Sequence, residues 1–269
     1  MSAAAPGLLD AQRLEREIGQ RIGSDNLALH YLPSCGSTNS ECMRHGRHGT
    51  LVIAEHQSEG RGRRGNQWHS PASRNIYCSL GIEKNIDAEF LGLLSLQVGV
   101  SVAGVLRRLG YQSVSLKWPN DILLNGKKLG GILIETRVTG ENRFLLVIGL
   151  GLNSSLDEAT LQQISRPATS LEQAQEEPVD RHRLLVELLG DMFNAVVKLE
   201  KPGFASLLET FTAYDSLFGQ AVSVHTREQT LHGVYQGLAD TGQIQVLTDD
   251  GLLSFSASEI SLREQMSCC

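Results

Sequence analysis

The sequence predicts an α+β protein in which a small β domain follows one large domain. The chain has 269 residues, of which 41% are hydrophobic and 20% charged, and this is enough apolar material for one large core and a small one. From Leu27 onward, short β-rich runs alternate with helical patterns. Beyond Gly219 the pattern changes to period-two alternation, which is typical of a small β-barrel or meander. We therefore expect two domains: residues 1–218, which open with a short helical segment at 1–30, and residues 219–269.

Apolar residues at intervals of three and four predict the helices. One short amphipathic helix precedes His30, and the strongest helix covers about Ala88–Leu109, where Gly110 supplies a stop. A third, "RHRLLVELLGDMFNAVVKLE", ends before Pro202, and a fourth follows at once. The apolar positions are Leu8, Leu14, Ile18 and Ile22 in the first helix, Leu91, Leu94, Val98, Val102, Val105 and Leu109 in the second, and Phe204, Leu207, Leu208, Phe211 and Tyr214 in the fourth.

Short runs of apolar and β-branched residues predict the strands. In the first domain these runs are "LALHYL", "LVIAEH", "NIYCSLGI", "SVSLKW", "GILIET" and "RFLLVIGLGLN". In the second they are "AVSVHT", "LHGVYQGL", "GQIQVL" and "LLSFSA", with a turn at Asp249-Asp250-Gly251 before the last. A polar, loop-rich stretch runs from Ser154 to Asp180.

Charge and hydropathy argue against several classes of protein. The net charge of −6 leaves no broad electrostatic footprint for nucleic acid or an anionic membrane. The first residues lack a basic segment followed by an apolar core, so they do not resemble a secretion signal. The longest uncharged stretch, Phe90–Leu106, is interrupted by glycine and polar residues and is shorter than the roughly 20 apolar residues of a membrane span. We expect a soluble, cytoplasmic protein.

The cysteines and histidines predict no disulfide framework and no metal site. The five cysteines are odd in number and have no C-x-x-C spacing. A nucleophilic Cys35 is an alternative, although a thiol that only packs is the simpler interpretation. His45 and His48 have H-x-x-H spacing, but glycines interrupt the segment and it holds no carboxylate, so we expect a surface turn. The cysteines are Cys35, Cys42, Cys78, Cys268 and Cys269.

The segment "GRGRRGNQW", Gly60–Trp68, concentrates positive charge on a flexible backbone. Arg61, Arg63 and Arg64 lie between glycines, and no acidic residue occurs from Gly60 to Ile82. Charge repulsion should keep this loop open until an anion binds and orders it. Glycines let backbone N–H groups approach phosphate oxygens, guanidinium groups bind such oxygens in pairs, and Trp68 offers a flat face to a ring. We expect an anionic, planar and enclosed substrate.

Three other interpretations of this loop compete with a bound anion. Gly60, Gly62 and Gly65 match G-x-G-x-x-G, but the Asn66–Pro71 segment cannot begin a core helix, so the dinucleotide-binding motif is excluded. No Gly-Lys-Ser/Thr closes the loop, which excludes the Walker motif. A solvated basic loop without a ligand is the simplest interpretation of an isolated arginine cluster.

A second polar group lies in "KWPNDILLNGKKLGGILIE". Pro119 fixes a turn after the strand "SLKW", and Asn125-Gly126 predicts a tight hairpin. The hairpin gathers four polar side chains at one strand end: Lys117, Asn120, Asp121 and Lys128. A lysine supplies a point charge for a polyphosphate, and an aspartate supplies a ligand for Mg²⁺. A surface hairpin with a salt bridge explains these residues equally well.

Two shorter motifs add polar groups that suit a neutral ligand. "CGSTN", Cys35–Asn39, follows the strand "LALHYL", and Ser-Thr-Asn is a common helix cap. This structural role competes with binding of a polar head group through the hydroxyls and the amide. "GLGLN" ends a buried strand with glycines that admit close approach, and Asn153 is able to pair with an amide-like edge.

In combination, these motifs resemble the bacterial biotin protein ligases. The match runs in order from about Leu8 to the C-terminus through "STN", "AEHQSEGRGRRGNQW", "KWPND", "KKLGGILIE", "GLGLN" and "EISLR". The resemblance implies a mixed β-sheet with flanking helices, as in class II aminoacyl-tRNA synthetases, followed by an SH3-like barrel from near Gly219. It also implies a two-step reaction, in which biotin and MgATP give biotinyl-5'-AMP and a lysine of a carrier protein then displaces AMP. ATP, Mg²⁺ and biotin are therefore expected as substrates, without a tightly bound metal.

The resemblance assigns a role to each motif residue. Arg63 and Lys128 resemble the catalytic groups that hold the carboxyl and the phosphate, and the arginine loop resembles a lid over a water-sensitive intermediate. The implied biotin-binding residues are Ser37, Thr38, Asn39, Gln57, Gly60, Arg61, Gly62, Arg63, Lys128 and Gly131. The implied nucleotide-binding residues are Trp68, Lys117, Asn120, Asp121 and Asn153, with Asp121 also expected as a Mg²⁺ ligand.

Two departures from the family pattern qualify these expectations. Asn66 stands where the family often has a further basic residue, which increases the dependence on Arg64. Many relatives have an N-terminal winged helix-turn-helix, whereas the first strand here begins near Leu27. We expect a ligase without sequence-specific DNA binding or membrane attachment. The expected partners are the biotin carboxyl carrier protein of acetyl-CoA carboxylase and a possible second copy of the chain.

Three alternatives compete with this interpretation. A lipoate ligase shares the fold and the chemistry but does not usually have this arginine loop. A regulator that binds biotinyl-AMP as a signal is disfavoured by the short N-terminus. An anion-binding module without chemistry gives no reason for Lys128 and Asp121 to accompany the loop.

Overall fold

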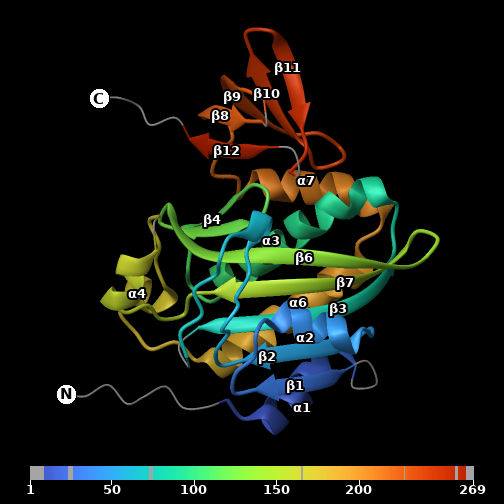
Figure 1. Ribbon diagram of the computed structural model, residues 1–269, viewed down its shortest axis with the longest axis vertical. Helices are drawn as coiled ribbons and strands as arrows, with labels where there is room; N and C mark the ends of the chain where they lie inside the picture. The colour runs from blue at the N-terminus through green and yellow to red at the C-terminus, as the bar shows by residue number, and fades with distance from the viewer. Residues whose placement is uncertain are drawn as a thin grey trace.

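A seven-stranded mixed sheet forms the centre of the computed structural model, and a five-stranded antiparallel sheet follows it in the chain (Figure 1). The structure describes residues 9–23, 27–72, 75–164, 166–226, 228–257 and 260–264. The expectations that concern Leu8, Cys268 and Cys269 therefore lie outside the described residues, as does the first residue of "EISLR". The mixed sheet with helices and the small β domain are both as the sequence predicts. The domain boundary near residue 219 stays a prediction.

The strands of the large sheet bring distant motifs to one end. Their order is β1-β2-β3-β7-β6-β5-β4, with β1 parallel to β2 and all other neighbours antiparallel. The strands are β1 (Ala28–Leu32), β2 (Thr50–Ala54), β3 (Ile76–Asn85), β4 (Val114–Lys117), β5 (Asp121–Leu124), β6 (Lys127–Gly140) and β7 (Arg143–Leu152). Leu152 pairs with Ile76 and Gly130, and Gly131 pairs with Asp121. The starts of β3, β5 and β6 therefore meet the end of β7.

Apolar strands with two buried faces account for the helices on both sides of the sheet. The helices are α1 (Ala11–Ile22), α2 (Thr38–His45), α3 (Leu91–Arg108), α4 (Glu158–Gln163), α5 (Leu171–Gln175), α6 (Arg181–Lys198) and α7 (Phe204–Thr212). On one face Val52, Leu145 and Val147 pack with Cys42 of α2. On the other face the neighbouring residues Leu51, Ile53, Leu146 and Ile148 join the main core with α1, α3 and α6.

The main helix predictions are confirmed. Asp10 and Asp180 cap α1 and α6, since their side chains accept hydrogen bonds from the backbone of Arg13 and Arg183. The predicted loop-rich stretch holds the two short helices α4 and α5, which a helical pattern of so few residues does not reveal. Asn125 and Gly126 have φ values of 51° and 71°, as the predicted tight hairpin between β5 and β6 requires.

The helix Ala88–Arg108, which consists of a 3-10 turn and α3, is long and apolar enough to cross a membrane. It has 21 residues and a mean hydropathy of 1.7 in its most apolar window. The helix is longer than the uncharged stretch Phe90–Leu106 because it includes the charged residues Glu89, Arg107 and Arg108 at its ends. Half of that window is buried, and α3 packs against α6, α7 and the sheet. This is the packing of a core helix in a globular domain.

The C-terminal strands form a separate antiparallel sheet in the order β11-β10-β9-β8-β12. They are β8 (Ala221–His225), β9 (Thr230–Leu238), β10 (Ile244–Thr248), β11 (Gly251–Phe255) and β12 (Ser261–Glu264). Val222, Tyr235 and Ile244 are buried in the same core cluster as the large domain. The indole Nε1 of Trp118 donates to the carbonyl oxygen of Gly242 at 3.0 Å, which fixes this sheet against the β4–β5 turn.

The cysteines and histidines have structural surroundings. Burial raises the pKa of Cys35 to about 11 and that of Cys42 and Cys78 to about 12, so all three remain thiols at neutral pH. A nucleophilic Cys35 is therefore disfavoured. His45 stacks on His30, with ring centroids 3.7 Å apart, and His48 packs edge-on against Phe193. Across the described ranges, no group of three or more His, Cys, Asp or Glu side chains is placed to hold a metal.

Candidate active site

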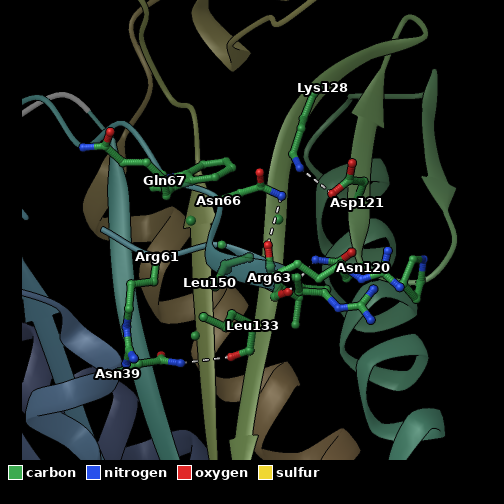
Figure 2. A pocket seen from close by; sticks show the side chains of 18 of the residues that line it. Asn39, Arg61, Arg63, Asn66, Gln67, Asn120, Asp121, Lys128, Leu133 and Leu150 are labelled. Carbon is green, nitrogen blue, oxygen red and sulfur yellow. Dashed lines mark hydrogen bonds and ion pairs between the residues drawn. The ribbon is translucent and has the colours of Figure 1, made fainter. Parts of the chain in front are cut away.

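A cavity of about 210 Å³ opens at the sheet end where the motifs meet (Figure 2). Its walls come from the N-terminus of α2, the arginine loop, the β4–β5 turn and strands β6 and β7. The predicted site residues that line it are Ser37, Thr38, Asn39, Gln57, Arg61, Gly62, Arg63, Trp68, Lys117, Asn120, Asp121, Lys128 and Gly131. The sheet topology thus brings together residues that are far apart in the sequence.

A buried network of neutral polar groups forms one wall of this cavity. The hydroxyl of Ser79 lies 2.8 Å from Thr38 Oγ1 and 2.6 Å from Asn39 Oδ1. Gln57 Oε1 accepts hydrogen bonds from the backbone N–H and the hydroxyl of Thr38, at 2.9 and 3.1 Å. Ser79 is fully buried, and sequence analysis missed it. The available signal was one serine within the otherwise apolar run "IYCSLGI".

The polar motif at the start of α2 does not act as a simple helix cap. Ser37 has the extended backbone of an N-cap residue, but within the described part of the chain its side chain makes no capping hydrogen bond. Asn39 instead donates through Nδ2 to Glu135 Oε2 at 2.8 Å and to the carbonyl oxygen of Leu133 at 3.2 Å. The motif therefore presents polar groups to the cavity and ties α2 to β6.

The arginine loop is a closed hairpin. The backbone N–H of Trp68 donates to the carbonyl oxygen of Gly60 at 2.8 Å, and that of Gly62 donates to Asn66 at 2.7 Å. A Cβ atom at Gly60 would lie 2.4 Å from the carbonyl oxygen of Trp68, so this position requires glycine. Gly60 does not line the cavity, but it closes the loop that does. At the tip, Arg64 has a φ of 56°, a conformation that costs energy in a residue with a Cβ atom.

The closed loop differs from the open loop that charge repulsion predicts. Arg61 forms an ion pair with Glu135 Oε2 at 2.8 Å, and Glu135 comes from β6. Arg63 and Arg64 both donate through Nη2 to the carbonyl oxygen of Ala257, at 2.8 and 3.0 Å. Acceptors from distant parts of the chain thus offset a repulsion that is evident in the local sequence. Burial, and secondly the nearby Arg64, lowers the pKa of Arg63, so a bound anion would stabilise this cation.

Lys128 and Asp121 form a pair at the start of β6 and β5, where Figure 2 shows the two side chains pointing toward each other. The side chain of Lys128 is only 12% exposed, and burial lowers its pKa despite the opposing effect of Asp121. Arg166 Nη1 lies 3.6 Å from the second carboxylate oxygen, Asp121 Oδ2. One carboxylate is therefore shared by two cations. Asn120 is held differently, since its Nδ2 donates to the carbonyl oxygen of Ile132 at 2.8 Å.

Trp68 lies against two glycines that face each other across β6 and β7. Gly131 pairs with Gly151, and a Cβ atom at Gly151 would be only 2.5 Å from Cε2 of the indole. The indole fits here because neither glycine has a side chain. Lys128 Nζ lies 5.6 Å from the ring centroid. The indole Nε1 is buried and has no acceptor among the residues that the structure describes.

A second cavity, of about 240 Å³, adjoins the first on the other side of Trp68 and Lys128. It is lined by Asn66, Gln67, Trp68, His69, Lys128, Asn153, Ile164, Arg166 and Ala168. Asn153 is buried, and its Nδ2 donates to the carbonyl oxygen of Thr169 at 3.1 Å. Sequence analysis assigned no site residue to the 154–180 stretch and so missed Ile164 and Arg166.

Family models match most of the chain. The model described as the biotin/lipoate A/B protein ligase family matches residues 36–153, and the model described as the biotin protein ligase C terminal domain matches residues 217–263. The bifunctional ligase/repressor BirA of Salmonella typhimurium is 34% identical over 262 residues, which cover 95% of this chain and 79% of that relative. The biotin ligase of acetyl-CoA carboxylase from Paracoccus denitrificans is 29% identical over 236 residues, 83% of this chain and 96% of the relative.

Solved structures are similar over nearly the whole chain. The biotin protein ligase from Aquifex aeolicus in complex with biotin and ATP has 27% sequence identity and a TM-score of 0.74. The similarity covers 88% of this chain and 99% of that structure. The apo form of the same Aquifex aeolicus protein gives a TM-score of 0.73 at 25% identity. Both the large sheet and the C-terminal sheet therefore have counterparts in these structures.

Proposed function

Because this chain belongs to the biotin protein ligase family, we propose that its two adjoining cavities divide the family's small substrates between them. The chain is an ATP-dependent biotin protein ligase. We assign biotin to the cavity with the buried polar wall and adenosine to the cavity that holds Asn153. The observation that carries this assignment is that the two cavities meet at Lys128, where the reacting groups have to come together.

The first step requires a carboxylate to approach a polyphosphate. At an effective dielectric of about 20, two unit like charges 4 Å apart repel by about 4 kcal/mol, so the step needs cations at the meeting point. Lys128, nearly buried between the cavities, is suited to hold the carboxylate against the α-phosphate. Arg63 lines the first cavity as well and adds a second cation. Biotin carboxylate attacks phosphorus, pyrophosphate leaves and biotinyl-5'-AMP forms.

Magnesium fits this arrangement as part of the ATP complex. Among the described residues that line the first cavity, Asp121 is the one carboxylate. Mg²⁺ is commonly held by one or two carboxylates together with phosphate oxygens and water, so Asp121 would serve as its protein ligand. Bound there, the ion would neutralise charge on the phosphates, while Lys128 would become available to the substrate.

The second step needs the labile anhydride to survive until a carrier lysine arrives. The hairpin at Gly60–Trp68 covers the cavity, and its residues make contacts both to β6 and to Ala257. We propose that it is a lid that keeps biotinyl-5'-AMP from water. The lysine amine then attacks the carbonyl carbon, the bond to the phosphate oxygen breaks, and AMP leaves. The proposed acceptor is the biotin carboxyl carrier protein of acetyl-CoA carboxylase.

Further proposals concern assembly and location. Beyond Gly131, β6 pairs with β7 alone among the described strands, which leaves a strand edge through which a second copy can pair. We propose a homodimer at this edge, testable by sedimentation with and without biotin and ATP. The net charge of −6 supports a chain that does not bind operator DNA or a membrane. We propose that it acts in the cytoplasm. Salt-sensitive retention of a specific DNA fragment would contradict this proposal.

One incubation tests the proposed function. The protein is mixed with radiolabelled biotin, MgATP and a biotin carboxyl carrier domain, and AMP and labelled carrier are both quantified. We expect the two products in equal amounts. Replacement of biotin by lipoate should give neither product, and equal turnover of lipoate would identify the protein as a lipoate ligase instead. AMP without labelled carrier would show that only the first step belongs to this chain.

A further inference from the structure

Arg166 occupies a position that neither the motifs nor the proposed roles explain. It follows α4 in the loop-rich stretch and lines both cavities. The residues common to the two cavities are Asn66, Gln67, Trp68, Lys128 and Arg166. Only the last two of these are cations. Arg166 therefore lies on the path that connects the proposed biotin and adenosine sites.

The backbone beside Arg166 is fixed to the start of β6. The N–H of Lys128 donates to the carbonyl oxygen of Pro167, and the N–H of Thr169 donates to the carbonyl oxygen of Lys128, both at 3.0 Å. Asn153 also donates to Thr169, at 3.1 Å. This segment thus moves with the strands that build the site. The side chain of Arg166 is still 51% exposed and has room to reorient when a ligand enters.

The charges around Arg166 leave an excess of positive charge. Asp121 is shared by Arg166 and Lys128, and Lys117 stands opposite Asp121 in the β4–β5 pairing. Arg166 and Lys117 both lower the pKa of Lys128 through repulsion, although burial is the largest cause. At the junction of the cavities, Lys128 and Arg166 thus share the single carboxylate of Asp121. A ligand with several negative charges would relieve this repulsion, and a guanidinium binds two phosphate oxygens at once.

We propose that Arg166 binds the β- and γ-phosphates of ATP, the part that leaves as pyrophosphate. This inference rests on the proposed function. Lys128 is nearly buried and suits the α-phosphate, which stays in the intermediate, whereas Arg166 is half exposed and suits the departing group. When Mg²⁺ and nucleotide bind, the guanidinium exchanges Asp121 for phosphate oxygens. Arg166 is then a substrate-binding residue for the first step and has no part in the second.

The two half-reactions separate this role from a structural one. In biotin-dependent exchange of pyrophosphate into ATP, Arg166→Gln should raise the KM for both ATP and pyrophosphate by on the order of tenfold, the low end for a charged hydrogen bond at an exposed site. Transfer from supplied biotinyl-5'-AMP to the carrier domain should proceed at the wild-type rate. Arg166→Lys should restore part of the lost affinity. A matched control is Arg143→Gln, since Arg143 is 55% exposed and pairs with Glu83 away from both cavities.

Three outcomes would overturn the proposal. An unchanged KM for ATP and pyrophosphate shows that Arg166 does not bind the phosphates, and an equal loss in both half-reactions shows a structural role. The third concerns indirect action through Asp121, which is tested in an Asp121→Asn background. If Arg166→Gln then has no further effect on KM, Arg166 only positions the carboxylate. Absence of any biotin-dependent exchange in the wild-type protein would refute the proposed function itself and is distinguishable from all three.

Discussion

Replacement of Gly151 by alanine tests the position of Trp68 most directly. The new Cβ atom would lie 2.5 Å from Cε2 and 2.6 Å from Nε1 of the indole. Carbon atoms in contact are normally about 3.5 Å apart or more, so the ring must move by about 1 Å. Trp68 lies in the loop and is only partly buried, so the ring can move without disrupting the core. We therefore expect a loss of activity with little change in stability.

The size of the loss follows from the role of the indole. A displacement of about 1 Å in a substrate-positioning group costs on the order of 10²-fold, so kcat/KM for ATP should fall by about that factor. The assay is biotin-dependent ATP–pyrophosphate exchange over a range of ATP concentrations, with the melting temperature measured alongside. In a Trp118→Phe background, the fluorescence of Trp68 should also shift, because the sequence has only two tryptophans.

A control separates this effect from the mere addition of a methyl group. At Gly104 in α3 the nearest atoms to a new Cβ would be 3.8 and 3.9 Å away, an ordinary contact. Gly104→Ala should leave the kinetics unchanged and stabilise the helix by up to about 1 kcal/mol. If Gly151→Ala retains the wild-type kcat/KM for ATP and the wild-type fluorescence, the indole does not contact the nucleotide, and the assignment of the second cavity to adenosine loses its support.

The remaining predictions concern the lid, the central lysine and the polar wall. Arg63→Gly should release biotinyl-5'-AMP and label lysines of a bystander protein, and intermediate release at the wild-type level would count against a lid. Burial lowers the pKa of Lys128, and the first step needs this lysine as a cation. The rate of the first step should therefore fall as the pH rises, and the fall should begin at a lower pH than the pKa of a free lysine predicts. Lys128→Arg should shift this fall in rate to higher pH. If the pH at which the rate falls is unchanged, the titration belongs to another group. Ser79→Ala should raise the KM for biotin roughly tenfold and leave that for ATP unaffected, because two buried polar neighbours lose a partner. An equal rise in both would show a general distortion of the sheet.

Periodicity and turn chemistry made much of the fold predictable. The helices at Leu91–Arg108 and Arg181–Lys198 have apolar residues on a helical repeat, and the strands are short apolar runs bounded by turns. Asn125-Gly126 specified the hairpin that places Lys128 beside Asp121. The resemblance to a known family supplied the remaining site residues, because roles such as that of Asn153 do not follow from composition or spacing.

The parts that sequence analysis missed depend on contacts between distant residues. The arginine loop is held by the carboxylate of Glu135 and the backbone carbonyl of Ala257, neither of which lies near it in the sequence. Ser79 looks like one polar residue in an apolar strand until Thr38 and Asn39 are placed against it. Arg166 lies in a polar stretch without periodicity, and the backbone pairing of Lys128 with Ala168 brings it to the cavity. Such signals exist only once the chain has folded.

The hydrogen bond from Arg63 to Ala257 joins the arginine loop to the connection between β11 and β12 of the C-terminal sheet. The acceptor is a backbone carbonyl, so substitution of the alanine side chain does not remove it, and only its position in space matters. Ile260, from the same end of the chain, also lines the first cavity. A shift of the C-terminal domain would therefore move the acceptor of Arg63 and displace the proposed lid. Chimeras that exchange this domain between relatives should therefore release biotinyl-5'-AMP to a different extent. The cause would be a changed orientation of the C-terminal domain on the large domain, even with every catalytic side chain retained.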